Sequence, residues 1–126
     1  MLRFVKLINK NTNVLKNVIN KNGKNIGNID ITISKGDPII TEMLIDEKYR
    51  KKGYGSLLLS NTEEELIKLG ANSIILNLWS LDRCFFNYSR FYSKKGYVSF
   101  IDNNKNNVLD DGNNLYYNLK LIKSLY

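Results

Sequence analysis

The sequence predicts one α+β domain, with a mostly antiparallel sheet of about seven strands and two main helices. Two observations support this fold class. Short apolar runs separated by turn signals fill the first 45 residues. Two longer segments with helical spacing follow, each between apolar runs of strand length. The 126 residues suit a single core, and we expect residues 1–126 to form one domain.

Four strands are predicted before residue 46. Ile29, Ile31 and Ile33 fall at period two, which is typical of a strand with one buried face. A turn signal, Asn-Gly at residues 22–23, predicts a tight hairpin because both residue types tolerate positive φ. The only proline, Pro38, lies at the entry of the next strand, where a missing donor is tolerated. The predicted strands are residues 4–8, 14–19, 26–33 and 39–45.

Two helices and three further strands are predicted in the second half of the chain. Leu59, Thr62 and Leu66 recur at helical spacing, and Gly70 is placed to end that helix. A second helix is expected over residues 80–95, with basic residues at its end. The remaining predicted elements are strands at 73–79, 97–101 and 115–122, and a polar hairpin loop at 102–114.

Composition excludes several classes of function. The formal net charge is +7, but the lysines are scattered as on a solvated surface, so no nucleic-acid partner is predicted. The chain has no histidine and a single cysteine, Cys84, which excludes His-dependent triads, Cys-rich zinc sites and internal disulfides. We therefore predict no metal. The sequence has no long apolar run and no signal-peptide pattern, so we expect a cytoplasmic protein without a membrane partner.

The most informative stretch is a basic glycine loop, Arg-Lys-Lys-Gly-Tyr-Gly-Ser at residues 50–56, between the fourth strand and the first helix. At a helix N-terminus the backbone N–H groups lack partners and the helix dipole adds positive charge, so the loop favours an anion. Gly53 and Gly55 allow a ligand to approach the backbone closely. A Walker A loop needs a lysine after its last glycine, and the Rossmann fingerprint needs three glycines. Neither pattern describes this loop.

The spacing Arg50-x-x-Gly53-x-Gly55 resembles the coenzyme A loop of the GNAT superfamily of N-acetyltransferases. One helix, one strand and one further helix downstream, Tyr92-x-x-x-Gly96 is similar to that family's helix-to-strand segment. The resemblance covers residues 14–121, and the order of the two motifs makes it specific. It implies a GNAT-like domain whose sheet is splayed in the middle. The helices that usually follow the first strand would be reduced, because residues 9–13 leave little room for them.

The resemblance implies that acetyl-CoA is the co-substrate. Backbone N–H groups of the loop would hold its pyrophosphate, and the basic side chains of the loop would lie near phosphate or solvent. Unpaired backbone groups of the preceding strand would hold the pantetheine arm. The cofactor-binding residues that it implies are Leu44, Ile45, Arg50, Lys51, Lys52, Gly53, Tyr54, Gly55 and Ser56.

Two side chains are candidates for proton transfer during direct attack by a primary amine. By the resemblance, Tyr92 would protonate the departing thiolate. Alternatively it is a core aromatic, because Phe85, Tyr88 and Tyr92 share one helical face. Glu42, the only acid in its strand, is the candidate base for the amine proton. The family's glutamate usually lies earlier, so a strand bulge would have to bring Glu42 into place. A solvated strand carboxylate is the alternative.

The resemblance therefore implies an acetyl-CoA-dependent N-acetyltransferase acting on a primary amine. With few N-terminal helices to enclose it, the acceptor site should be shallow or completed by another subunit. That suits a protein or peptide amine, or a small polyamine. Trp79 is a candidate for this site or for the core, and the sequence does not choose between a monomer and a homodimer. The alternative is a catalytically inactive GNAT-fold binding module that retains coenzyme A, because Phe85 replaces an asparagine common in the family.

Overall fold

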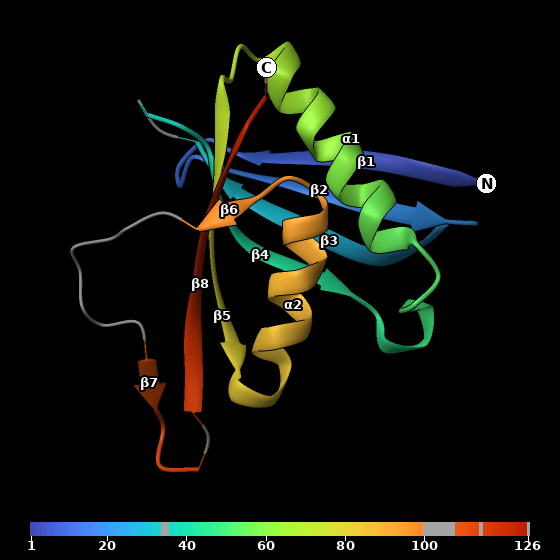
Figure 1. Cartoon of the computed structure of the whole chain (residues 1–126). Coiled ribbons are helices and arrows are strands. Elements are labelled where there is room, and N and C mark those ends of the chain that lie inside the picture. The colour runs from blue at the N-terminus through green and yellow to red at the C-terminus, as the bar shows by residue number, and fades with distance from the viewer. Residues whose placement is uncertain (34–35, 100–107, 114, 126) are drawn as a thin grey trace.

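The computed structural model describes residues 1–33, 36–99, 108–113 and 115–125 (Figure 1). Within these ranges the chain forms eight strands, two α-helices and one 3₁₀ helix. The strands are β1 (Leu2–Asn9), β2 (Val14–Lys21), β3 (Lys24–Thr32), β4 (Ile39–Ile45), β5 (Ser73–Leu81), β6 (Val98–Ser99), β7 (Val108–Asp110) and β8 (Leu115–Ser124). The helices are η1 (Glu47–Tyr49), α1 (Tyr54–Lys68) and α2 (Asp82–Lys94).

The strands form one sheet in the order β1-β2-β3-β4-β5-β8-β6, and β7 also pairs with β8. Neighbouring strands are antiparallel except β4 and β5, which are parallel. Within the described residues, β4 and β5 pair only at Ile39–Ile75 and Ile40–Leu76, although both strands continue for several residues. The two strands therefore diverge beyond Ile40. The predicted α+β fold with a sheet splayed in its middle is confirmed.

Both α-helices cover the same face of the sheet (Figure 1). Helix α1 packs on β2, β3 and β4, and α2 packs on β5 and β8. One core cluster lies between the helices and the sheet, built mainly from isoleucine and leucine that alternate along the strands. None of the helices in the described part of the chain is long and apolar enough to span a membrane.

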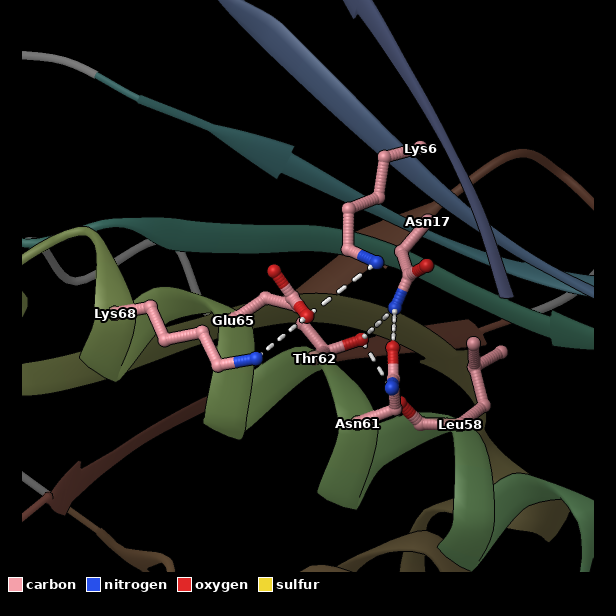
Figure 2. Close-up of polar contacts among 7 residues, drawn as sticks. All are labelled: Lys6, Asn17, Leu58, Asn61, Thr62, Glu65 and Lys68. Carbon is pink, nitrogen blue, oxygen red and sulfur yellow. Dashed lines mark hydrogen bonds and ion pairs between the residues drawn. The ribbon is translucent and has the colours of Figure 1, made fainter. Parts of the chain in front are cut away.

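Asn17 of β2 fixes the position of α1 on the sheet (Figure 2). It is only 1% exposed, and its Nδ2 donates hydrogen bonds to Asn61 Oδ1 at 3.0 Å and to Thr62 Oγ1 at 2.9 Å. Lys6 of β1 adds an ion pair with Glu65 at 3.5 Å. Because these contacts are directional, they set the rotation of α1 about its axis, and with it the direction of its N-terminus.

Most predicted elements are present, with boundaries shifted by a few residues. The connection between β1 and β2 is a short turn without a helix, as predicted. The predicted loop at 102–114 is wrong in one part, because residues 108–110 form β7 and raise the number of strands in the described sheet to eight. A three-residue strand is too short to show a period-two pattern, so the sequence does not reveal it.

Candidate active site

A cleft of about 670 Å³ opens where β4 and β5 diverge. On one side lie β4, the loop after it and the first turn of α1, and on the other lie the end of β5 and α2. The lining residues are Thr41, Glu42, Met43, Leu44, Ile45, Tyr49, Arg50, Lys51, Gly53, Gly55, Ser56, Leu78, Trp79, Tyr88, Phe91 and Tyr92. This set includes nine of the eleven predicted site residues; the exceptions are Lys52 and Tyr54.

The glycine loop and the start of α1 place unpaired backbone N–H groups at one end of the cleft. Lys51 and Gly53 have φ angles of 61° and 86°, so the chain passes twice through the left-handed region before α1 begins. Gly53 occupies the N-cap and provides no side-chain cap. In the first backbone hydrogen bond of α1, the Leu57 N–H donates to the Gly53 carbonyl at 3.1 Å. The N–H groups of the first helical turn before Leu57 therefore have no acceptor within the helix, and they are donors for an anion.

The side chains of the loop point in different directions. Arg50 Nε donates a hydrogen bond to the Ile45 carbonyl at 2.8 Å, which closes the loop onto the end of β4. Tyr54 lies against β2 instead, where its hydroxyl accepts a hydrogen bond from Lys21 Nζ at 2.6 Å. Lys52 Nζ lies 6.0 Å from the centroid of the Tyr49 ring. Any contribution of Lys52 and Tyr54 to the cleft would therefore come from their backbone.

Tyr92 is positioned by the way α2 ends. The Gly96 N–H donates to the Ser93 carbonyl and the Tyr97 N–H donates to the Tyr92 carbonyl, both at 3.1 Å, while Gly96 has a φ of 93°. This is a Schellman motif, in which a glycine in the left-handed region follows the last helical residues. Its characteristic apolar contact joins Tyr92 and Tyr97, whose ring centroids are 5.8 Å apart. The glycine four residues after Tyr92 is therefore explained by helix termination.

The Tyr92 side chain belongs to the core and also lines the cleft. It is 4% exposed, and its hydroxyl donates to Met43 Sδ at 3.1 Å. A thioether is a weak acceptor, so this hydroxyl is held without a strong partner. Burial, with a smaller effect from Tyr88, raises the pKa of the Tyr92 phenol above its ordinary value. At physiological pH the group is therefore a neutral hydrogen-bond donor.

Glu42 lies on the face of the sheet away from the helices, because β4 contains a bulge. Ile40 pairs with Ile31 and Glu42 pairs with Asp30, which leaves Thr41 without a partner strand residue. Without this extra residue, Glu42 would share the core-facing side with Ile40. A bulge of the kind that the Glu42 hypothesis required is thus present.

The Glu42 carboxylate is held by a neighbouring amide on the face of the sheet away from the helices. Asn28 Nδ2 donates to Glu42 Oε2 at 3.3 Å and to Asp30 Oδ1 at 2.9 Å. Trp79 is 44% exposed and lines the same cleft. Tyr92 of α2 lies on the helix-covered side of the sheet, and Glu42 lies on the other side. Both residues line the cleft, so the cleft extends through the gap between β4 and β5.

Six lining residues were not predicted: Thr41, Met43, Tyr49, Leu78, Tyr88 and Phe91. Two of them carried a usable signal, because Tyr88 is spaced three residues from Phe91 and four residues from Tyr92 on the same helix. The others come to the cleft through strand divergence and loop folding, which no local pattern encodes. The side chain of Phe85, which bears on the inactive-module alternative, lies outside the described part of the structure, as does that of Cys84.

Comparison with known proteins agrees with this geometry. The family model described as "Acetyltransferase (GNAT) domain" matches residues 12–99, which is more than half of the chain. The chain belongs to the GNAT acetyltransferase family. The match spans β2 to β6 and therefore contains the glycine loop, the diverging strands and Tyr92. Comparison with curated proteins gave no significant match.

Solved structures of GNAT-family proteins share this fold. An IAA acetyltransferase from Bacillus cereus has a TM-score of 0.74 at 14% identity, with 98% of this chain and 99% of that chain covered. A GNAT family acetyltransferase from Elizabethkingia anophelis, solved with acetyl-CoA bound, has a TM-score of 0.72 at 15% identity, with coverage of 90% and 77%. The ribosomal-protein-S18-alanine N-acetyltransferase from Escherichia coli has a TM-score of 0.72 at 17% identity, with coverage of 90% and 70%. At these identities the similarity concerns the fold.

Proposed function

We propose that this GNAT-family chain is an N-acetyltransferase that transfers the acetyl group of acetyl-CoA directly to a primary amine, with residues 1–126 as one catalytic domain. The observation that carries the proposal is the cleft between the diverging strands β4 and β5, which has the N-terminus of α1 at one end. A cleft with an anion site and a neutral buried hydroxyl suits a phosphate-bearing thioester.

The residues present fit acetyl-CoA, which supplies an acetyl thioester when bound. The N–H groups at the start of α1 would hold its pyrophosphate. The Asp46 N–H donates to the Ile26 carbonyl across the β3–β4 pair, so alternation along the strand directs the Ile45 backbone groups into the gap. The Ile45 carbonyl already accepts a hydrogen bond from Arg50 Nε. We therefore expect the Ile45 N–H to bind the pantetheine arm, with the Leu44 side chain lining the cleft.

Tyr92 would act as the general acid. The amine nitrogen forms a bond to the acetyl carbon, the carbon–sulfur bond breaks, and the sulfur leaves as a thiolate that needs a proton. A thiolate is a far stronger acceptor than the Met43 thioether that the Tyr92 hydroxyl now contacts at 3.1 Å. The hydroxyl would therefore exchange one sulfur partner for another without moving far. The phenolate that results takes its proton back from solvent.

Glu42 would accept the proton of the attacking amine, directly or through a water molecule. Its carboxylate is partly exposed on the outer face of the sheet and is held by Asn28. In the described part of the chain no helix covers that face, so the acceptor approaches from solvent. This supports a protein or peptide amine, or a small polyamine, as the acceptor. One fold relative is named for acetylating an alanine of ribosomal protein S18, so a protein amine has a precedent in this fold.

Coenzyme binding is tested by thermal unfolding with and without acetyl-CoA. At a hundred times its dissociation constant, a ligand stabilises the native state by about 2.7 kcal/mol, which raises the Tm of a chain of this size by roughly 10 °C. Gly55→Glu should abolish the shift, because a Cβ at Gly55 already lies 3.3 Å from Met43 Cε and the carboxylate would repel phosphate. Gly36→Glu is the control, because a Cβ there meets nothing within 4 Å. An unchanged Tm at millimolar acetyl-CoA would refute the proposal.

Catalysis is tested by release of free thiol in a screen of lysine peptides, N-terminal peptides and polyamines. Tyr92→Phe should lower kcat by about 10²- to 10⁴-fold while the acetyl-CoA shift in Tm persists. Tyr116→Phe is the matched control, because Tyr116 is a half-buried tyrosine of β8 that does not line the cleft. If both variants turn over like the wild type, Tyr92 is not the acid. If acetyl-CoA binds but no amine is acetylated, the chain is an inactive binding module.

A further inference from the structure

Four lysines surround the ring of Tyr49 at the edge of the cleft. Lys24 Nζ and Lys48 Nζ each lie 5.7 Å from its ring centroid, Lys21 Nζ lies 5.9 Å away, and Lys52 Nζ lies 6.0 Å away. Two of these lysines come from the ends of β2 and β3 and two from the segment around η1. We refer to these four side chains as the lysine ring.

The fold itself brings the lysine ring together. The hairpin turn between β2 and β3 carries Lys21 and Lys24 on either side of residues 22–23. The segment around η1 is tied to β3 through the hydrogen bond from the Asp46 N–H to the Ile26 carbonyl at 2.8 Å. Tyr49 also packs edge-on against Tyr54 at 6.2 Å between centroids. The hairpin and the loop are therefore neighbours through backbone pairing, and the lysines share one small surface.

This concentration of charge has no ion-pair partner among the residues that the structure describes. Any two of the four ammonium groups lie within about 12 Å of each other, because each lies within 6 Å of the same ring centroid. Repulsion over such distances is only partly screened at physiological ionic strength, where the Debye length is about 8 Å. In the described part of the chain none of these lysines forms an ion pair, although Asp46 and Glu47 are close in sequence. The face of a tyrosine ring compensates a cation weakly.

The lysine ring adjoins the proposed coenzyme site. Tyr49 lines the cleft together with Lys51 and Gly53 of the glycine loop. An anion that rests on the loop N–H groups would therefore have the lysine ring beside it, at a second position. Ammonium groups bind phosphate as point charges, and several together favour a doubly charged group over a carboxylate.

We propose that the lysine ring is a second phosphate-binding site, separate from the glycine loop, and that it binds a terminal phosphate group. Two sources share this chemistry. One is the phosphate on the ribose of coenzyme A, in which case the inference rests on the proposed function and makes the cleft discriminate against coenzyme that lacks this group. The other is a phosphate that does not belong to the coenzyme.

The test measures binding by titration calorimetry with coenzyme A, dephospho-coenzyme A and inorganic tripolyphosphate. The variant is Lys24→Gln/Lys48→Gln, which removes two exposed charges of the ring. The charge-matched control is Arg3→Gln/Lys10→Gln, which removes two exposed charges on β1 and the turn after it. Lys24→Arg/Lys48→Arg keeps both charges and should restore binding. Thermal unfolding without ligand checks that each protein is folded.

If the ribose phosphate is the ligand, the wild type binds coenzyme A roughly two- to twenty-fold more tightly than dephospho-coenzyme A, which is the range expected for two exposed charge pairs. The glutamine variant loses that preference and the control keeps it. If the phosphate has another source, the two coenzymes bind alike, but tripolyphosphate binds the wild type more tightly than the glutamine variant. The inference is overturned if the glutamine variant matches the wild type for all three ligands. If the proposed function fails instead, neither coenzyme binds. Tripolyphosphate would still bind the lysine ring of the wild type more tightly than that of the glutamine variant.

Discussion

Substitution of Gly27 by alanine should disturb the strand that forms one wall of the cleft. A Cβ at this position of β3 would lie 2.6 Å from the Leu44 carbonyl oxygen and 2.6 Å from Ile45 Cδ1. The Ile45 side chain can rotate away, but the Leu44 carbonyl belongs to the neighbouring strand. That oxygen must move by about 0.8 Å to reach a separation of 3.4 Å. Overpacking of this kind costs about 1–3 kcal/mol of the free energy of unfolding.

The assay is urea denaturation of the Gly27→Ala variant, followed by thermal unfolding with acetyl-CoA. We expect a lower midpoint with an unchanged slope, and a smaller acetyl-CoA shift because Leu44 and Ile45 line the cleft. Gly36→Ala is the matched control, because its Cβ meets nothing within 4 Å and the change should be neutral or stabilise by up to about 1 kcal/mol. If Gly27→Ala behaved like this control, close contact between β3 and β4 would not explain the glycine.

Two further predictions concern buried polar groups. Burial, and then the nearby Glu63 carboxylate, raise the pKa of Tyr97, so above about pH 10 the unfolded chain loses a proton that the folded chain keeps. Stability should fall with rising pH there, and Tyr97→Phe should reduce the fall between pH 9 and pH 11 by about 1.4 kcal/mol in total, as measured by urea titration; an equal fall in both proteins would contradict the assignment. Asn17→Asp should cost about 2–4 kcal/mol at pH 7, because it replaces the amide donor to Asn61 and Thr62 with a buried charge. The cost should be smaller at pH 4, where protonation removes that charge, and a pH-independent loss would show that charge burial is not the cause.

The sequence predicted the elements that depend on local patterns. Period two marked β3, the Asn-Gly turn at residues 22–23 marked the β2–β3 hairpin, and helical spacing marked α1. The loop at residues 50–56 was recognisable because residue types with special backbone properties must stand at fixed spacing there. The same holds for Tyr92 and Gly96, where a helix ends in a Schellman motif. These signals are short-range, so one sequence is sufficient to find them.

Features that depend on contacts between distant segments were not predictable. The lysine ring combines a hairpin with a loop more than twenty residues later, and Tyr49 carries no motif that marks its position. The sequence indicated the bulge at Thr41 only as a condition for the role of Glu42. The bulge arises from the register between β3 and β4, which no local pattern encodes. The sequence does not distinguish Gly27 from other residues of its strand, because its close contact with Leu44 arises only where β3 and β4 pair. In each case the reason lies in pairing across strands rather than in the local sequence.

The glycine loop and Tyr92 belong to different helices, and contacts between these helices hold the loop and the tyrosine in a fixed relation. The Tyr97 hydroxyl donates to Glu63 Oε2 of α1 at 2.9 Å, and Lys123 of β8 pairs with the same oxygen at 3.0 Å.

Because Tyr97 also contacts the Tyr92 ring in the Schellman motif, the end of α2 is fastened to the middle of α1. The N-terminus of that same helix carries the loop, and Asn17 fixes its rotation on the sheet. The distance between the start of α1 and the Tyr92 hydroxyl is therefore set by hydrogen-bonded contacts on the core side of the sheet. The outer face of the sheet has no comparable set of contacts in the described residues, where Asn28 alone holds Glu42. Under the proposed function, substitutions around Glu42 would change which amine is used without moving the position of the thioester.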